Sequence, residues 1–170
     1  MFKTSDAFFA LAMESIEHLN VWAIKYKPNA IADHICYKCN SSEEFDYLRK
    51  LFETNCSFIY QSIISSRRIA IIKFLQPIKS LLGDISFLEL SDQKPDGSQI
   101  SGFDHIEIYP IRGTMEELSN HLEQKGAQVE KIIRPHHTTF DLTIYGSFKV
   151  RIEPEPLIQK IVRDEIKNGA

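Results

Sequence analysis

The sequence predicts an α+β fold made of two similar halves, each in the order strand, helix, strand, strand, strand. The tripeptide Asp-His-Ile occurs twice, beginning at Asp33 and at Asp104, and each copy opens a predicted strand. A capping-box pattern, Ser or Thr followed by Glu at the third position after it, comes after each strand and begins at Ser41 and Thr114. The same signals therefore recur in the same order in both halves.

The spacing of the two copies also indicates a duplication. The separation between His34 and His105 equals the separation between Asn55 and Gly126, the residues predicted to end the two helices. A constant offset across a strand and a helix is typical of an internal repeat. The two histidines are therefore expected at equivalent places in the two halves.

The first half is assigned to residues 31–91. Its predicted strands span residues 31–38, 58–64, 69–74 and 85–90, and its helix carries the apolar stripe Phe45, Leu48 and Phe52. Residues 77–83 are expected to form a short link. Residues 92–102, which contain Pro95 and Gly97, hold several turn formers and are expected to join the halves.

The second half is assigned to residues 103–153. Its predicted strands span residues 103–109, 128–133, 139–145 and 148–153, and its helix lies between Thr114 and Gly126. Before the first half, residues 1–30 are expected to hold a helix from Ser5 or Asp6 to Leu19 and a connection. A further helix, residues 157–167, is expected within residues 156–170. The whole chain, residues 1–170, is predicted to be a single domain.

The bulk composition excludes some classes of function. A net charge of −3 without a basic stripe does not favour nucleic acid as a partner. The first twenty or so residues carry Lys3, Asp6, Glu14 and Glu17, so neither a signal peptide nor a membrane span is expected there. Three cysteines fit a reducing cytoplasm. A small molecule is the expected partner, and monomer and homodimer both stay open.

Alternation along the predicted strands sorts their side chains into two faces. Asp33 and Asp104 are predicted to face away from the histidines, so we do not expect them to be metal ligands. The face that carries the histidines is polar and is expected to line a cavity. The residues expected to line this cavity are His34, Cys36, Lys38, Glu89, His105, Glu107, Tyr109, Arg151 and Glu153.

Two imidazoles and one or two carboxylates from different strands are a common ligand set for a divalent metal ion. Neutral imidazole suits Zn, Ni, Fe or Mn, and a carboxylate offsets the charge of the ion. Glu107 could instead orient an imidazole from outside the ligand set, or pair with Arg151 or Lys149. Each histidine taken alone could also be an ordinary buried residue.

The segments Ala32-Asp33-His34-Ile35, with Cys39, and Gly102-Phe103-Asp104-His105-Ile106-Glu107-Ile108 carry a resemblance to a known group. They resemble the vicinal oxygen chelate superfamily, which includes glyoxalase I, extradiol dioxygenases and bleomycin-resistance proteins, and within it the YecM-like bacterial proteins. The resemblance implies paired βαβββ modules that form a curved mixed sheet, a glyoxalase-like cup, with a metal ion inside. The ligand positions of the superfamily fall on His34, Glu89, His105 and Glu153. The YecM-like group can carry histidine at the last of these positions.

The resemblance implies a metal-dependent enzyme that acts on a small oxygen-chelating substrate. In an isomerase or lyase, Glu89 or Glu153 would be the general base. In a dioxygenase, His34, His105 and Glu153 would hold Fe(II). The alternative is a non-catalytic module that binds a small ligand, as bleomycin-resistance proteins do.

Several other residues invite a functional interpretation. Cys36 and Cys39 form a Cys-x-x-Cys pattern, but two such residues on a strand point to opposite faces, so we reject a zinc or redox site. The pair His136-His137 is expected in a solvated loop, with closure over the cavity as the alternative. Arg67-Arg68 is either a pair of surface arginines or a clamp for an anionic substrate.

Overall fold

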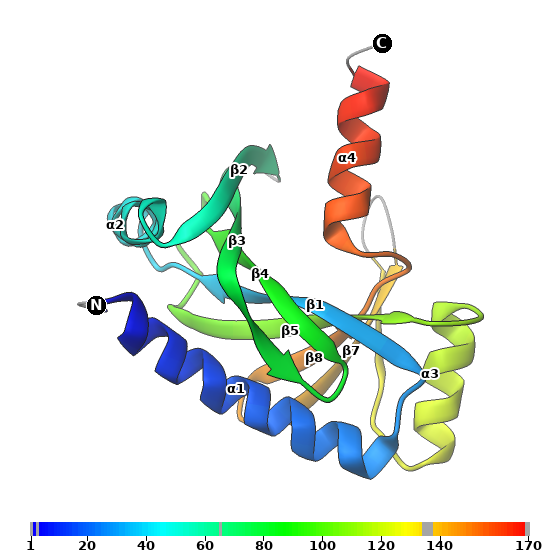
Figure 1. Ribbon diagram of the computed structural model, residues 1–170. Coiled ribbons are helices and arrows are strands. Elements are labelled where there is room, and N and C mark those ends of the chain that lie inside the picture. The colour runs from blue at the N-terminus through cyan, green and yellow to red at the C-terminus, as the bar shows by residue number, and fades with distance from the viewer. Residues whose placement is uncertain (1, 3, 65, 134–137, 169–170) are drawn as a thin grey trace.

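The computed structural model describes residues 2, 4–64, 66–133 and 138–168. These residues form four helices and one eight-stranded sheet (Figure 1). The helices are α1 (Ser5–Tyr26), α2 (Ser42–Glu53), α3 (Met115–Gln124) and α4 (Leu157–Asn168). The strands are β1 (Ala30–Lys38), β2 (Cys56–Ile64), β3 (Arg67–Ser80), β4 (Gly83–Ser91), β5 (Gly102–Pro110), β6 (Glu130–Ile133), β7 (Thr138–Tyr145) and β8 (Phe148–Ile152).

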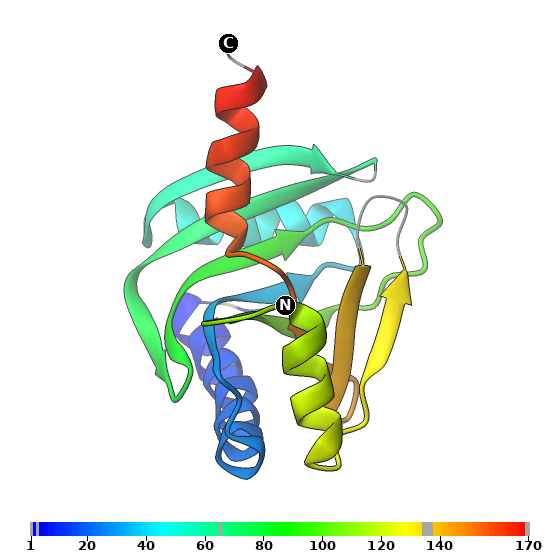
Figure 2. The same cartoon turned by 90° about the vertical axis from the view of Figure 1, so that its right-hand side faces the viewer.

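The sheet confirms the α+β fold with two repeats. Its strand order is β2-β3-β4-β1-β5-β8-β7-β6, so each half contributes four adjacent strands. The first strand of each half pairs in parallel with the last strand of the same half, β1 with β4 and β5 with β8. The halves meet where β1 and β5 pair antiparallel. The resulting mixed sheet is strongly curved, as the glyoxalase-like cup requires (Figure 2).

Helix α1 is longer than the sequence predicted. It begins after Thr4, whose side chain accepts a hydrogen bond from the backbone N–H of Ala7, and it ends at Tyr26 rather than Leu19. The apolar stripe continues through Trp22 and Tyr26, both buried, so the helix gains packing energy by continuing past the predicted end. Figures 1 and 2 show α1 and α4 on opposite sides of the sheet.

The ends of the two repeat helices agree with the sequence in part. Thr114 and Glu117 form the complete capping box at α3, and Gly126 adopts a left-handed backbone after it. At α2 the side chain of Ser41 caps the helix as expected. The left-handed position predicted for Asn55 is wrong, because its side-chain amide donates a hydrogen bond to the Leu51 carbonyl and satisfies the helix end in another way.

The link predicted at residues 77–83 is also wrong. Strand β3 continues to Ser80, and β4 begins at Gly83, so most of this segment is paired. Pro77 lies in the irregular stretch between the pairs Lys73–Phe87 and Ile78–Ile85. A proline lacks the N–H that a regular ladder needs, and an irregularity in the strand accommodates it.

Among the residues described here, none of the helices is both long enough and apolar enough to cross a membrane.

The fold predicts a clear contrast between two substitutions in α1. Ile16 is fully buried, whereas Ile24 is 63 % exposed on the same helix. Ile16→Ala should lower the free energy of unfolding by about 2–5 kcal/mol, because it leaves a cavity in the core. Ile24→Ala should change it by only about 0.5 kcal/mol. Urea unfolding measures both, and equal effects would contradict the placement of the buried face.

Candidate metal centre

A cavity of about 230 Å³ opens on the side of the sheet where α4 begins. Residues of β2, β3, β4, β5 and β8 line it, together with the first turns of α4. Its acidic and basic lining residues are Arg67, Glu89, Glu107, Arg151, Glu153 and Glu155. Its other lining residues are Tyr60, Ser62, Ile64, Ile69, Ile71, Pro154, Leu157 and Ile161.

The two Asp-His pairs lie in two β-bulges of the central strand pair. Ala32 pairs with Ile108 and Ile35 with Ile106, so Asp33 and His34 together oppose Glu107 alone. Similarly, Cys36 pairs with His105 and Tyr37 with Phe103, which leaves Asp104 as the extra residue of β5. A bulge interrupts the alternation of side chains along a strand and changes the face of the sheet toward which they point. The prediction that both aspartates face away from the histidines is therefore wrong.

His34 is held by the aspartate that precedes it. Its Nδ1 lies 3.0 Å from Asp33 Oδ1, and the imidazole is only 1 % exposed. An ionised carboxylate can only accept a hydrogen bond, so Nδ1 carries the proton. The other ring nitrogen, Nε2, is buried and has no hydrogen-bond partner among the described residues. A buried polar atom without a partner is rare and calls for an explanation.

His105 is held in the same way, but its second nitrogen has a partner. Its Nδ1 lies 2.7 Å from Asp104 Oδ2, and its Nε2 lies 3.2 Å from Arg151 Nη1, which donates to it. Arg151 also donates two hydrogen bonds to Asp141, of 2.8 and 2.9 Å, which offsets its charge. Lys38 makes an ion pair of 2.5 Å with Asp104.

Glu107 lies between the two imidazoles. Its Oε2 is 3.5 Å from His34 Nε2, and its Oε1 is 3.5 Å from His105 Nε2. The ligand atoms of these three buried residues all lie within 4.8 Å of one another. Burial alone would raise the pKa of Glu107, but His34, His105 and Arg151 outweigh it and lower that pKa to about 2. The carboxylate is therefore ionised at neutral pH.

The negative charge around His34 has a matching effect on that residue. Burial alone would lower the pKa of His34, but the carboxylates of Glu107 and Asp33 outweigh it and raise that pKa to about 9. The site thus favours a positive charge at this imidazole. The same field that favours a proton there would also favour a divalent cation.

The other two carboxylates of the expected ligand set also lie at the cavity. Glu89 Oε2 is 4.0 Å from His34 Nε2, and its Oε1 accepts a hydrogen bond of 3.4 Å from the Cys36 thiol. Burial raises the pKa of Cys36, so the thiol keeps its proton and remains a donor. Glu153 follows β8 directly, is 7 % exposed and lines the cavity.

Five residues that were expected to line the cavity do not line it and lie behind its wall instead. They are His34, His105, Cys36 and Lys38, described above, and Tyr109, which is 2 % exposed. The hydroxyl of Tyr109 donates to Glu107 Oε2 at 3.2 Å and lies 3.0 Å from His34 Nδ1. The hydroxyl also accepts a hydrogen bond from the Leu157 N–H, which connects α4 to the site.

The sequence reasoning missed the roles of Asp33, Asp104 and Asp141. The first two repeat with the histidines in both halves, and that repetition was the signal available for them. Asp141 belongs to β7, and only the strand pairing reveals that it faces Arg151. The pair His136-His137 lies outside the described residues. Cys36 and Cys39 are both free thiols.

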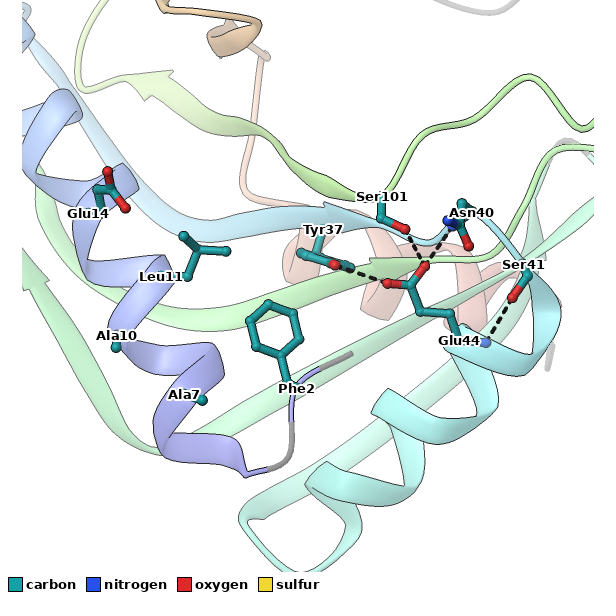
Figure 3. A pocket seen from close by; sticks show the side chains of 10 residues that line it. All are labelled: Phe2, Ala7, Ala10, Leu11, Glu14, Tyr37, Asn40, Ser41, Glu44 and Ser101. Carbon is teal, nitrogen blue, oxygen red and sulfur yellow. Dashed lines mark hydrogen bonds between the residues drawn. The ribbon is translucent and has the colours of Figure 1, made fainter.

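A larger groove of about 930 Å³ lies between α1 and the start of α2 (Figure 3). Its one buried carboxylate, Glu44, accepts hydrogen bonds from the Tyr37 hydroxyl at 3.0 Å, the Asn40 N–H at 2.8 Å and the Ser101 hydroxyl. Figure 3 shows these donors converging on the carboxylate. Glu44 is therefore fully used in joining β1, α2 and the linker, and the groove offers no comparable chemistry.

Comparison with known proteins places the chain in a family. The family model described as "YecM protein" matches residues 2–159. A solved structure described as "Structural Genomics, Protein EC4020" is similar over 95 % of this chain and 92 % of that chain, with 24 % identity and a TM-score of 0.70.

Weaker similarities were also found. Methylmalonyl-CoA epimerase in complex with methylmalonyl-CoA and NH4+ aligns with 76 % of this chain and 96 % of its own, at 14 % identity and a TM-score of 0.47. The Streptomyces coelicolor methylmalonyl-CoA epimerase variant E43Q aligns with 74 % and 98 %, at 15 % identity and a TM-score of 0.45. No curated protein matches the chain. Because the family model covers nearly the whole sequence, the chain belongs to the YecM family.

Proposed function

We propose that this protein binds one divalent metal ion through His34, His105 and Glu107 and presents it to a small oxygen-donor ligand in the adjoining cavity. The observation that carries the proposal is His34 Nε2, a buried nitrogen without a hydrogen-bond partner among the described residues. Asp33 holds a proton on Nδ1, so the ion would bind Nε2 in place of the second proton, which the surrounding carboxylates favour on this imidazole. An imidazole oriented by a carboxylate is the usual arrangement of a metal-binding histidine.

The donor set fits a divalent ion. Two imidazole nitrogens with carboxylate oxygens suit Zn, Ni, Fe or Mn, and the excess of buried carboxylates would offset the charge of the ion. Glu89 and Glu153 remain proposed ligands, since both line the same cavity. The guanidinium of Arg151 opposes a nearby cation, but its pairing with Asp141 reduces that repulsion.

When bound, the metal ion would stabilise negative charge that develops on a chelated oxygen. Glu89 and Glu153 are the proposed general bases, because each is a carboxylate on the cavity wall that can take a proton from a carbon next to a carbonyl. The Cys36 thiol holds Glu89 in place. The apolar side chains of Leu157 and Ile161 line the cavity and would reduce the access of water to the ligand. These roles support an isomerase or lyase, with an Fe(II) dioxygenase as the alternative.

One observation favours a second function, a ligand-binding module without a metal ion. The hydrogen bond from Arg151 Nη1 satisfies His105 Nε2, so this nitrogen does not require an ion. In that case the cavity would hold a small molecule through hydrogen bonds and ion pairs alone. Arg151 must give up this bond before His105 can serve as a ligand.

The metal proposal is tested by calorimetric titration with Zn²⁺ of protein freed of metal by dialysis. The wild-type protein should bind one equivalent, and His105→Ala should weaken binding by roughly 100-fold or more, because a ligand is lost. His121→Ala, on the exposed face of α3, is the matched control and should bind as the wild-type protein does. Equal binding by all three proteins would rule out this site.

A second titration separates the two proposed ligand sets. Glu107 is within 3.5 Å of both imidazoles, whereas Glu153 lies at the end of β8. Glu107→Gln should therefore weaken Zn²⁺ binding more than Glu153→Gln does, by roughly tenfold. The reverse order would assign the ligand role to Glu153 and leave Glu107 as an orienting residue.

A further inference from the structure

We propose that Arg67 is an anion-binding residue of the cavity and that the cavity takes a small organic acid. One end of this acid would meet the metal centre, and a carboxylate at its other end would pair with Arg67. The inference rests on the proposed function for the first contact only. The contact with Arg67 stands on separate observations.

Two adjacent arginines have very different surroundings. Arg68 is paired with carboxylates at both ends of its guanidinium, Asp92 at 2.7 Å and Asp46 at 2.5 Å. Arg67 makes no ion pair among the described residues, and its Nε is buried without a hydrogen-bond partner there. Arg68 therefore has a structural role, whereas the charge of Arg67 is uncompensated on the wall of the cavity.

A neutral side chain holds Arg67 in place. Arg67 Nη1 donates a hydrogen bond to Gln99 Oε1. Gln99 is buried, and its amide nitrogen donates to the Cys39 carbonyl at 2.7 Å and the Asp92 carbonyl at 2.8 Å. These carbonyls can only accept, so the amide must present its oxygen to Arg67. Gln99 thus positions the guanidinium through a neutral group, so the positive charge of Arg67 is left available to an anion.

The strand register places Arg67 at the far end of the cavity from the imidazoles. Arg67, Ile69 and Ile71 alternate along one face of β3, and all of them line the cavity. Ile71 pairs with Glu89, which contacts His34. Arg67 and Ile71 are four positions apart on the strand, a distance of roughly 13 Å along the backbone.

This arrangement defines a ligand with polar ends and an apolar middle. At one end are Glu89 and Glu107, which contact the imidazoles behind the cavity wall, and at the other is Arg67. Ile69 and Ile71 lie between these ends on β3. At the α4 side, Glu155 is already paired with Arg163 and does not compete for Arg67. A dicarboxylate whose first carboxylate carries an adjacent oxygen donor matches this order within about 230 Å³.

The test compares two probes that differ in the distal carboxylate, 2-oxoglutarate and 2-oxopentanoate, by calorimetry on Zn²⁺-loaded protein. The wild-type protein should bind 2-oxoglutarate at least roughly tenfold more tightly than 2-oxopentanoate, because the distal carboxylate gains a charge-assisted hydrogen bond from Arg67. Arg67→Gln should lose this preference and keep its Zn²⁺ affinity. Arg112→Gln, the same change at an exposed arginine, should keep the preference.

The outcomes separate this inference from the metal proposal. Glutarate and pentanoate are compared in the same way on metal-free protein, so a preference that depends on Arg67 supports the anion site even if Zn²⁺ does not bind. A wild-type protein that fails to discriminate within both pairs of probes overturns the inference, as does a preference that survives in Arg67→Gln. If that variant does not fold, Arg67→Lys replaces it and should reduce the preference severalfold, since an ammonium lacks the planar fork.

Discussion

The antiparallel pairing of β1 with β5 is the constraint on which the rest of the site depends. It joins the two repeats at their equivalent strands, so the duplicated Asp-His pairs lie near each other at two successive bulges, one in each strand. The bulge at Asp33 and His34 faces Glu107, which brings this carboxylate between the imidazoles. The parallel strands β4 and β8 then add Glu89 and Arg151 from either side.

This arrangement concentrates charge where a fold would ordinarily place apolar side chains. Burying ionised groups costs free energy that their mutual attraction repays only when geometry and hydrogen bonds are good. Here each imidazole has its own aspartate, and Arg151 is satisfied by Asp141. Within this network, as far as the described residues show, His34 Nε2 has no hydrogen bond, although Glu107 Oε2 lies 3.5 Å from it. A polar network that is complete except at one buried nitrogen indicates a place for a ligand rather than a structural core.

The sequence revealed the element order and the equivalence of His34 and His105, because capping boxes and repeat spacing are local signals. The sequence did not reveal the features that depend on pairing between distant segments, such as the direction in which a strand side chain points. A single extra residue in a bulge reverses the face of every side chain beyond it, so Asp33 could not be placed by alternation. The close contact of Glu107 with both imidazoles follows from the same register. Similarly, only the fold shows that Arg67 and Arg68 have different partners.

The central claim is that His34 and His105 belong to a metal centre. Elemental analysis of protein purified without chelators, alongside the His34→Ala variant, tests it most directly. The wild-type protein should contain close to one equivalent of a divalent transition metal, and the variant should contain far less while remaining folded. A wild-type protein that is free of metal and has no affinity for added divalent ions would contradict the claim.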